Sequence, residues 1–232
     1  STKLCIGVPF LFEVADQLIE YLPDLKFILP IAPTTSIAEI QYFSSSSNNP
    51  IAKQYNTSIK EIMQNENEKD LPILTTTKGA KIYLYNNQPA HSLLIKCDLA
   101  ITTVGANTAE LGALGIPMIV IVPTQHLNVM QAWDGILGLI GRMPFLKRLL
   151  GLLISIWSMR KRGFLAWPNI SAGKMIVPEK VGIIFPKDIT REALQWLQSP
   201  ERLQGQREDL KSIRGNPGAI ELLSEEIIKL LQ

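Results

Sequence analysis

This sequence has few cysteines, little net charge and no Asp-x-Asp metal-binding pair at a predicted strand end. It has only two cysteines, Cys5 and Cys97, far apart in the chain, so we expect buried, reduced thiols rather than a disulfide framework. The formal net charge of +2, from 23 basic and 21 acidic residues, is too small to indicate a nucleic-acid partner. No Asp-x-Asp pair stands at a predicted strand end, and we expect neither a metal ion nor a cofactor.

The N-terminus also lacks the basic start, apolar stretch and small-residue cleavage site of a signal peptide, and it has no initiator methionine. Apolar residues recur at helical spacing from Val8 to Leu22, so the first pattern in the chain predicts a helix over residues 8–21. An α/β domain usually begins with a strand. We therefore expect the chain to begin inside a longer protein, with at least one strand upstream of Ser1.

What the sequence does contain is an alternation of short apolar runs with segments of helical periodicity. The apolar runs predict strands over 25–31, 72–76, 81–85, 99–103, 118–122 and 181–185. The helical spacing predicts helices over 8–21, 37–43, 51–63, 88–95, 190–198, 202–213 and 219–231. With 46% hydrophobic residues, this alternation predicts an α/β fold, a Rossmann-like parallel sheet flanked by helices, in a single domain over residues 1–232.

Residues 97–126 have the order strand, glycine turn, helix, strand. Ligands of an open parallel sheet bind at the carboxyl ends of strands, beside helix N-termini. Backbone N–H groups at the helix start are therefore candidates for binding phosphate, namely those of Gly105, Ala106, Asn107 and Thr108. The carboxylate of Glu110 is a candidate acceptor for ribose hydroxyls, and His126 follows the end of the second strand, where a further ligand contact is expected.

Each of these residues also has an ordinary structural interpretation. Glu110 is compatible with a solvated helix residue, His126 with a surface residue, and any tight strand–helix turn needs a glycine such as Gly105. The pattern alone therefore indicates a place suited to a nucleotide and does not identify the ligand.

A second distinctive region follows His126. Residues 135–178 contain no acidic residue and seven basic ones, and the apolar run 149–159 between the basic clusters is about half as long as a membrane-spanning helix. This pattern predicts a membrane-associating insert over residues 135–162 that lies on an anionic membrane surface. The alternative is a helical hairpin packed against a partner half or a second subunit.

Trp167-Pro168-Asn169, which we expect to form a turn, opens a further motif. Seven of its positions match the pattern PN-x-x-AG-(R/K)-x-x-V-x-E, namely Pro168, Asn169, Ala172, Gly173, Lys174, Val177 and Glu179. Together with 97–126, this motif resembles the C-terminal half of lipid-A-disaccharide synthase, an inverting glycosyltransferase of the GT-B fold. The opening 8–32 also resembles the first helix and second strand of that half, whereas 35–95 resembles it weakly.

The resemblance implies the donor-binding half of a GT-B enzyme, with a UDP-sugar donor, UDP-2,3-diacylglucosamine or a related UDP-GlcNAc derivative, and a lipid acceptor. Asn169, Gly173 and Lys174 would then close the donor site opposite Gly105 and Glu110. Asn169 is also compatible with organising the Pro-Asn turn, and Lys174 with one more charge on a basic face. The acceptor-binding half, which in this family carries the proposed catalytic base, is not in the sequence, so we expect this chain alone to be inactive. The expected location is peripheral, on the cytoplasmic face of a bacterial inner membrane.

Two departures keep alternatives open. Val104 stands where the family usually has a serine, which removes a hydroxyl donor near phosphate, and Lys174 stands where arginine is common, which replaces a bidentate fork by a point charge. The segment 107–111 would suit the peptidoglycan GlcNAc transferase nearly as well. A third interpretation is a non-catalytic, membrane-associated interaction module.

Overall fold

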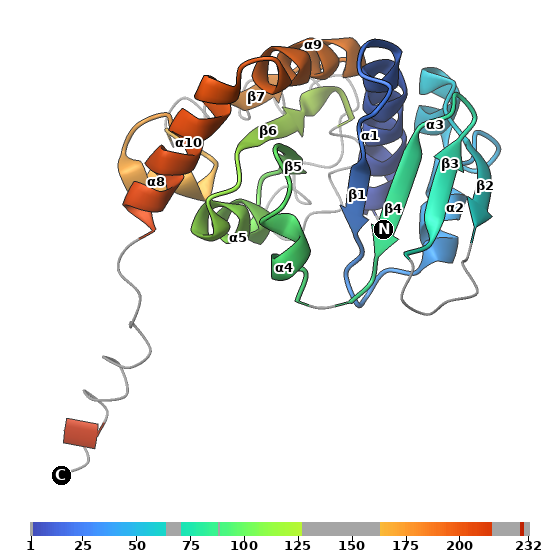
Figure 1. Ribbon diagram of the computed structural model, residues 1–232. Helices are drawn as coiled ribbons and strands as arrows, with labels where there is room; N and C mark the ends of the chain where they lie inside the picture. The colour runs from blue at the N-terminus through green and yellow to red at the C-terminus, as the bar shows by residue number, and fades with distance from the viewer. Residues whose placement is uncertain (1, 64–70, 88, 127–162, 215–227, 230–232) are drawn as a thin grey trace, which may run out of the picture.

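The computed structural model describes residues 2–63, 71–87, 89–126, 163–214 and 228–229, and it has an α/β fold with two β-sheets. Figure 1 shows one sheet with α1, α2 and α3, and the other with α5, α8, α9 and α10. The predicted fold class is confirmed, because the second sheet is parallel and has helices on both faces.

The first part of the chain builds the four-stranded sheet, in the strand order β1-β4-β3-β2. Strands β1 and β4 are parallel, whereas β3 pairs antiparallel with both β4 and β2, so this sheet is mixed. Its elements in chain order are α1 (Thr2–Tyr21), β1 (Phe27–Pro30), α2 (Ile37–Ser44), α3 (Pro50–Tyr55), β2 (Ile59–Met63), β3 (Ile73–Thr76) and β4 (Lys81–Tyr85).

The second part builds the three-stranded sheet, in the order β5-β6-β7, with all strands parallel. Its elements are α4 (His91–Leu94), β5 (Ala100–Thr103), α5 (Ala106–Leu114), β6 (Met118–Pro123), the short 3-10 helix η1 (Thr124–His126), α8 (Trp167–Ala172), β7 (Glu179–Gly182), α9 (Pro186–Leu197) and α10 (Pro200–Ile213). A proline at the first or second position begins α3, α8, α9 and α10, where its missing N–H costs no helical bond.

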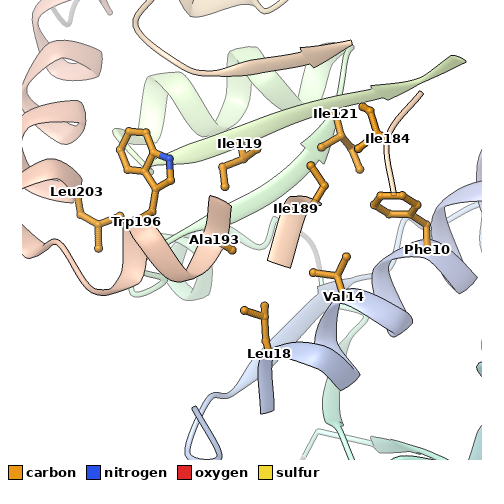
Figure 2. Close-up of a cluster of buried hydrophobic side chains, with 10 residues drawn as sticks. All are labelled: Phe10, Val14, Leu18, Ile119, Ile121, Ile184, Ile189, Ala193, Trp196 and Leu203. Carbon is orange, nitrogen blue, oxygen red and sulfur yellow. The ribbon is translucent and has the colours of Figure 1, made fainter. Parts of the chain in front are cut away.

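Strand β6 is buried on both faces and separates two clusters of the core. Side chains alternate along a strand, so Ile119 and Ile121 face α1 and α9, whereas Met118 and Val120 face α5, α8 and α10. Figure 2 shows the first cluster, which also contains Phe10, Val14, Leu18, Ile184, Ile189, Ala193, Trp196 and Leu203. This burial explains why 118–122 reads as a continuous apolar run.

Helix α1 joins the two sheets because it buries two of its faces. Phe10, Val14 and Leu18 pack toward β6 and α9, whereas Val8 and Phe12 pack against the apolar residues of β3 and β4. The predicted helix over 8–21 is therefore correct in type, and it begins earlier, at Thr2.

Three element predictions were wrong. The helix expected over 51–63 ends at Tyr55, because Asn56 adopts a left-handed conformation (φ 52°), and residues 59–63 pair with β3 as strand β2. Residues 167–169, expected to be a turn, begin helix α8. The strand expected over 181–185 lies over 179–182 instead.

Two predictions fall largely on residues that the structure does not describe. They are the membrane-associating insert over 135–162 and the terminal helix over 219–231, of which only residues 228–229 are described, as helical. Among the helices that the structure describes, none is both long and apolar enough to cross a bilayer.

Candidate functional site

The glycine turn lies at the carboxyl end of β5 and begins α5. Gly105 has φ 146° and ψ −164°, a backbone conformation that side-chain-bearing residues rarely adopt. Its carbonyl oxygen accepts hydrogen bonds from the backbone N–H of Thr108 at 3.0 Å and from the Thr108 hydroxyl at 2.9 Å. Ala106 and Asn107 are exposed, and no described side chain caps this helix start. The first turn of α5 is thus open to solvent at the edge where parallel sheets bind ligands.

Thr108 fastens a second helix to this turn. Its side chain is fully buried, and its hydroxyl oxygen accepts a hydrogen bond from the backbone N–H of Trp167 at 3.2 Å. One helical turn later, a Cβ placed on Gly112 would lie 3.0 Å from Cγ of Pro168. The start of α8 is therefore held against the first two turns of α5.

Glu110 lies on the second turn of α5 and is partly exposed. Its Oε1 lies 3.0 Å from Nε2 of His91, the first residue of α4, with side-chain exposures of 44% for Glu110 and 52% for His91. The carboxylate therefore faces solvent near the glycine turn and is also within hydrogen-bonding distance of an imidazole. The sequence did not predict this contact, since the two residues are 19 positions apart and no motif joins them.

Asn169 is placed differently, because it has no exposed surface. Its Oδ1 accepts from the backbone N–H groups of Ile176 and Val177, at 2.6 and 2.8 Å. Its Nδ2 donates to the Val177 carbonyl at 2.8 Å and to Glu179 Oε1 at 2.7 Å. The amide thus makes four internal hydrogen bonds and organises the loop after α8.

Glu179 completes this arrangement, which we call the Asn169–Glu179 network. Besides the Asn169 amide, its carboxylate accepts from the backbone N–H of Leu165 at 3.0 Å and of Ala166 at 2.8 Å. The carboxylate therefore satisfies the N–H groups of the two residues that directly precede α8. Asn169 is thus hydrogen-bonded to two other positions of the motif, Val177 and Glu179.

Gly173 and Lys174 lie where α8 ends. Gly173 ends α8 in a left-handed conformation (φ 64°), and the exposed Lys174 begins the loop that leads to the first residue of β7. The Gln206 side chain ties this loop to the start of β6, donating to the Ile176 carbonyl at 3.0 Å and accepting from Met118 N–H at 2.7 Å. The first residue of β7, Glu179, pairs with Val120 of β6, which pairs with Thr102, so β7 begins level with the end of β5. The roles predicted for Gly173 and Lys174 stay predictions.

His126 is the last residue of η1, directly after the end of β6, so its backbone lies at the same edge as the glycine turn. Its side chain is outside the described residues. The preceding Gln125 holds this segment to the chain after β7, because its side chain donates to the Ile184 carbonyl and accepts from Ile184 N–H at 3.2 Å. The role predicted for His126 stays a prediction.

The two cysteines are free, and neither has the environment of an activated thiol. Burial raises the pKa of both thiols, and the neighbouring Asp98 raises the pKa of Cys97 further. Among the described residues, no group of three histidine, cysteine or carboxylate side chains is placed to hold a metal ion.

No protein-family model matches the chain. Two curated proteins do, both lipid-A-disaccharide synthases. That of Sulfurihydrogenibium sp. is 25% identical over 236 residues, which cover 100% of this chain and 49% of that protein. That of Nitrosococcus oceani is 22% identical over 213 residues, which cover 91% of this chain and 41% of that protein. The chain thus spans about half the length of the curated relatives it matches, and it is distantly related to lipid-A-disaccharide synthase, a glycosyltransferase.

Proposed function

We propose that this chain is the donor-binding half of an inverting, lipid-directed glycosyltransferase resembling lipid-A-disaccharide synthase. The observation that carries the proposal is the open start of α5 at the carboxyl edge of the parallel sheet, with Gly105 at the turn and the partly exposed Glu110 on the next helical turn. The distant relationship to the synthase supports a nucleotide-sugar ligand at this turn.

In this proposal the N–H groups at the start of α5 bind the diphosphate of a UDP-sugar. Those of Ala106 and Asn107 lie at the positive end of the helix dipole, on exposed residues. Such fixed donors stabilise the negative charge that builds on departing UDP. Val104 supplies no hydroxyl, so backbone groups carry more of this task than in a turn that contains serine.

Glu110 accepts hydrogen bonds from the ribose hydroxyls, and His126 forms a further part of the donor site at the end of β6. Asn169 has a positioning role: it holds the loop after α8 and, through Glu179, the start of α8 beside Thr108. Gly173, which ends α8, and the exposed Lys174 after it are given no donor contact in this proposal.

The proposed donor is UDP-2,3-diacylglucosamine or a related UDP-GlcNAc derivative, and the acceptor is a lipid. An acceptor-binding half supplies the catalytic base, so the chain alone binds donor and does not turn it over. Peripheral attachment to an anionic membrane, on the cytoplasmic face of a bacterial inner membrane, would bring the site to its lipid substrates. Residues 135–162 are the sequence-based candidate for that attachment.

A second candidate is a peptidoglycan-type GlcNAc transferase, which the segment 107–111 favours. Donor binding would look the same in both cases, so acceptor assays with the complete protein discriminate them. A non-catalytic module, favoured by Val104, would bind no nucleotide at the turn.

Calorimetric titration with UDP and with UDP-GlcNAc tests the proposal. We expect weak binding of both, with no release of UDP from the sugar when the chain is incubated alone. ATP at the same concentration is the control for a general phosphate site. A folded sample that binds neither ligand at roughly millimolar concentration, or binds ATP equally well, would overturn the assignment.

A further inference from the structure

Helix α8 and the loop after it present large apolar side chains to solvent. Trp167 is 55% exposed, Ile170 50% and Met175 65%, and the charged Lys174 between the last two is exposed as well. We call these four residues the α8 face. Trp167 and Ile170 are three residues apart in the helix and therefore lie on the same side of it.

The apolar residues of the α8 face are not needed to fill the core. The opposite side of α8 makes the internal contacts, since Pro168 packs toward Gly112 and Asn169 is fully buried in the Asn169–Glu179 network. Exposed tryptophan, isoleucine and methionine gathered on a six-residue helix and the loop after it are unusual for a surface that meets only water.

The sequence around the α8 face favours an anionic partner. No acidic residue occurs in 163–178, and the next one along the chain, Glu179, turns its carboxylate inward to the N–H groups of Leu165 and Ala166. Lys174 is the one basic residue of 163–178, and Arg160, Lys161 and Arg162 directly precede it in sequence. A tryptophan beside aliphatic side chains and lysine suits the boundary of lipid headgroups and acyl chains.

We propose that the α8 face docks on the surface of an anionic lipid bilayer. Trp167, Ile170 and Met175 enter the headgroup–acyl boundary, and Lys174 pairs with anionic headgroups. The Trp167 backbone is bonded to Thr108, whose hydroxyl is bonded to Gly105, so the docked surface is mechanically joined to the glycine turn. If the proposed function holds, this joint presents the donor site close to the membrane that contains its lipid acceptor.

Co-sedimentation with vesicles tests the proposal. The full chain is compared with the triple variant Trp167→Ser, Ile170→Ser and Met175→Ser, on vesicles of phosphatidylcholine alone and of phosphatidylcholine mixed with phosphatidylglycerol. A matched control carries Ile95→Ser, Val181→Ser and Ile183→Ser, at residues outside the α8 face that are 52%, 37% and 70% exposed. We expect the chain to prefer the anionic vesicles, the triple variant to bind them at least about tenfold more weakly, and the control to bind like the parent.

Circular dichroism establishes that each variant is folded, and the double variant Ile170→Ser, Met175→Ser replaces the triple one if the loss of Trp167 prevents folding. Parent-like vesicle binding by a folded α8-face variant would assign attachment to another segment and overturn the proposal. Equal binding of the parent to both kinds of vesicle, or loss of self-association rather than of vesicle binding in the variant, would also overturn it. UDP titration of the same samples separates the two proposals, because UDP binding without vesicle binding contradicts only this one, and the reverse contradicts only the donor site.

Discussion

The glycine turn at Gly105 and the Asn169–Glu179 network are both marked by sequence motifs, yet one has exposed polar groups and the other buried ones. At the turn, Ala106, Asn107 and Glu110 face solvent, and the helix start has no side-chain cap. In the network, Asn169 is fully buried and uses its amide for four internal hydrogen bonds. A specific motif can therefore record a demanding loop geometry, while the less specific one carries the open groups that a ligand can reach.

The largest expected effect is a loss of stability when the Asn169–Glu179 network is disrupted. Asn169→Ala leaves the buried N–H groups of Ile176 and Val177 without their acceptor and removes one partner of Glu179. We expect a loss of about 3 kcal/mol or more in the free energy of unfolding, measured by urea denaturation. The control Asn107→Ala, at an exposed asparagine of the turn, should change stability by less than about 0.5 kcal/mol.

The opposite result would break the comparison. If Asn169→Ala unfolds at the same urea concentration as the parent but no longer binds UDP, then Asn169 is a ligand contact and not a structural one.

The second effect concerns the backbone of the turn. Gly105→Ala places a side chain at φ 146°, and we expect it to lower the free energy of unfolding by about 1–3 kcal/mol and to weaken UDP binding, because the helix start must shift. Gly205→Ala is the matched control, since Gly205 lies inside α10 with open space around its missing Cβ. That variant should gain about 0.5–1 kcal/mol. Unchanged stability and UDP affinity for Gly105→Ala would mean that the turn tolerates the shift and binds no phosphate.

The third effect is on affinity alone. Glu110→Ala should weaken UDP binding about tenfold, because acceptors for the ribose hydroxyls are lost, and should leave stability nearly unchanged at this partly exposed site. Glu61→Ala, at an exposed position of β2 in the other sheet, is the control in the same calorimetric titration. Equal affinity for parent and Glu110→Ala would remove the ribose assignment and leave Glu110 as the partner of His91.

Much of the fold was predictable, because local patterns match the elements that they predict. The strand over 81–85 and the run beginning at Met118 are confirmed as β4 and β6, because their buried positions hold apolar residues. The segment 51–63 was not predictable in this way. Its apolar spacing fits a helix, and only the left-handed Asn56 and the pairing of Ile59–Met63 with β3, a non-local contact, turn it into a strand.

The candidate site was predictable only in part, for a related reason. Strand–turn–helix order located the glycine turn, because Gly105 and the helix start are adjacent in sequence. The contact between His91 and Glu110 and that between Thr108 and Trp167 join different elements, so no local sequence pattern predicts them. The motif at 167–179 identified residues that belong together without showing whether they face a ligand or one another.

The smallest expected effect concerns the charge of Lys174, directly after α8. Lys174 is exposed in the loop before β7, where solvent screens its charge. Lys174→Ala should therefore weaken UDP binding by less than about twofold, well below the loss for Glu110→Ala in the same titration. Lys187→Ala, at an exposed lysine near the start of α9, is the control for a general loss of positive charge. If Lys174→Ala weakens UDP binding more than Glu110→Ala does, the ligand lies beside the loop after α8, and the motif marks the donor site directly instead of positioning it.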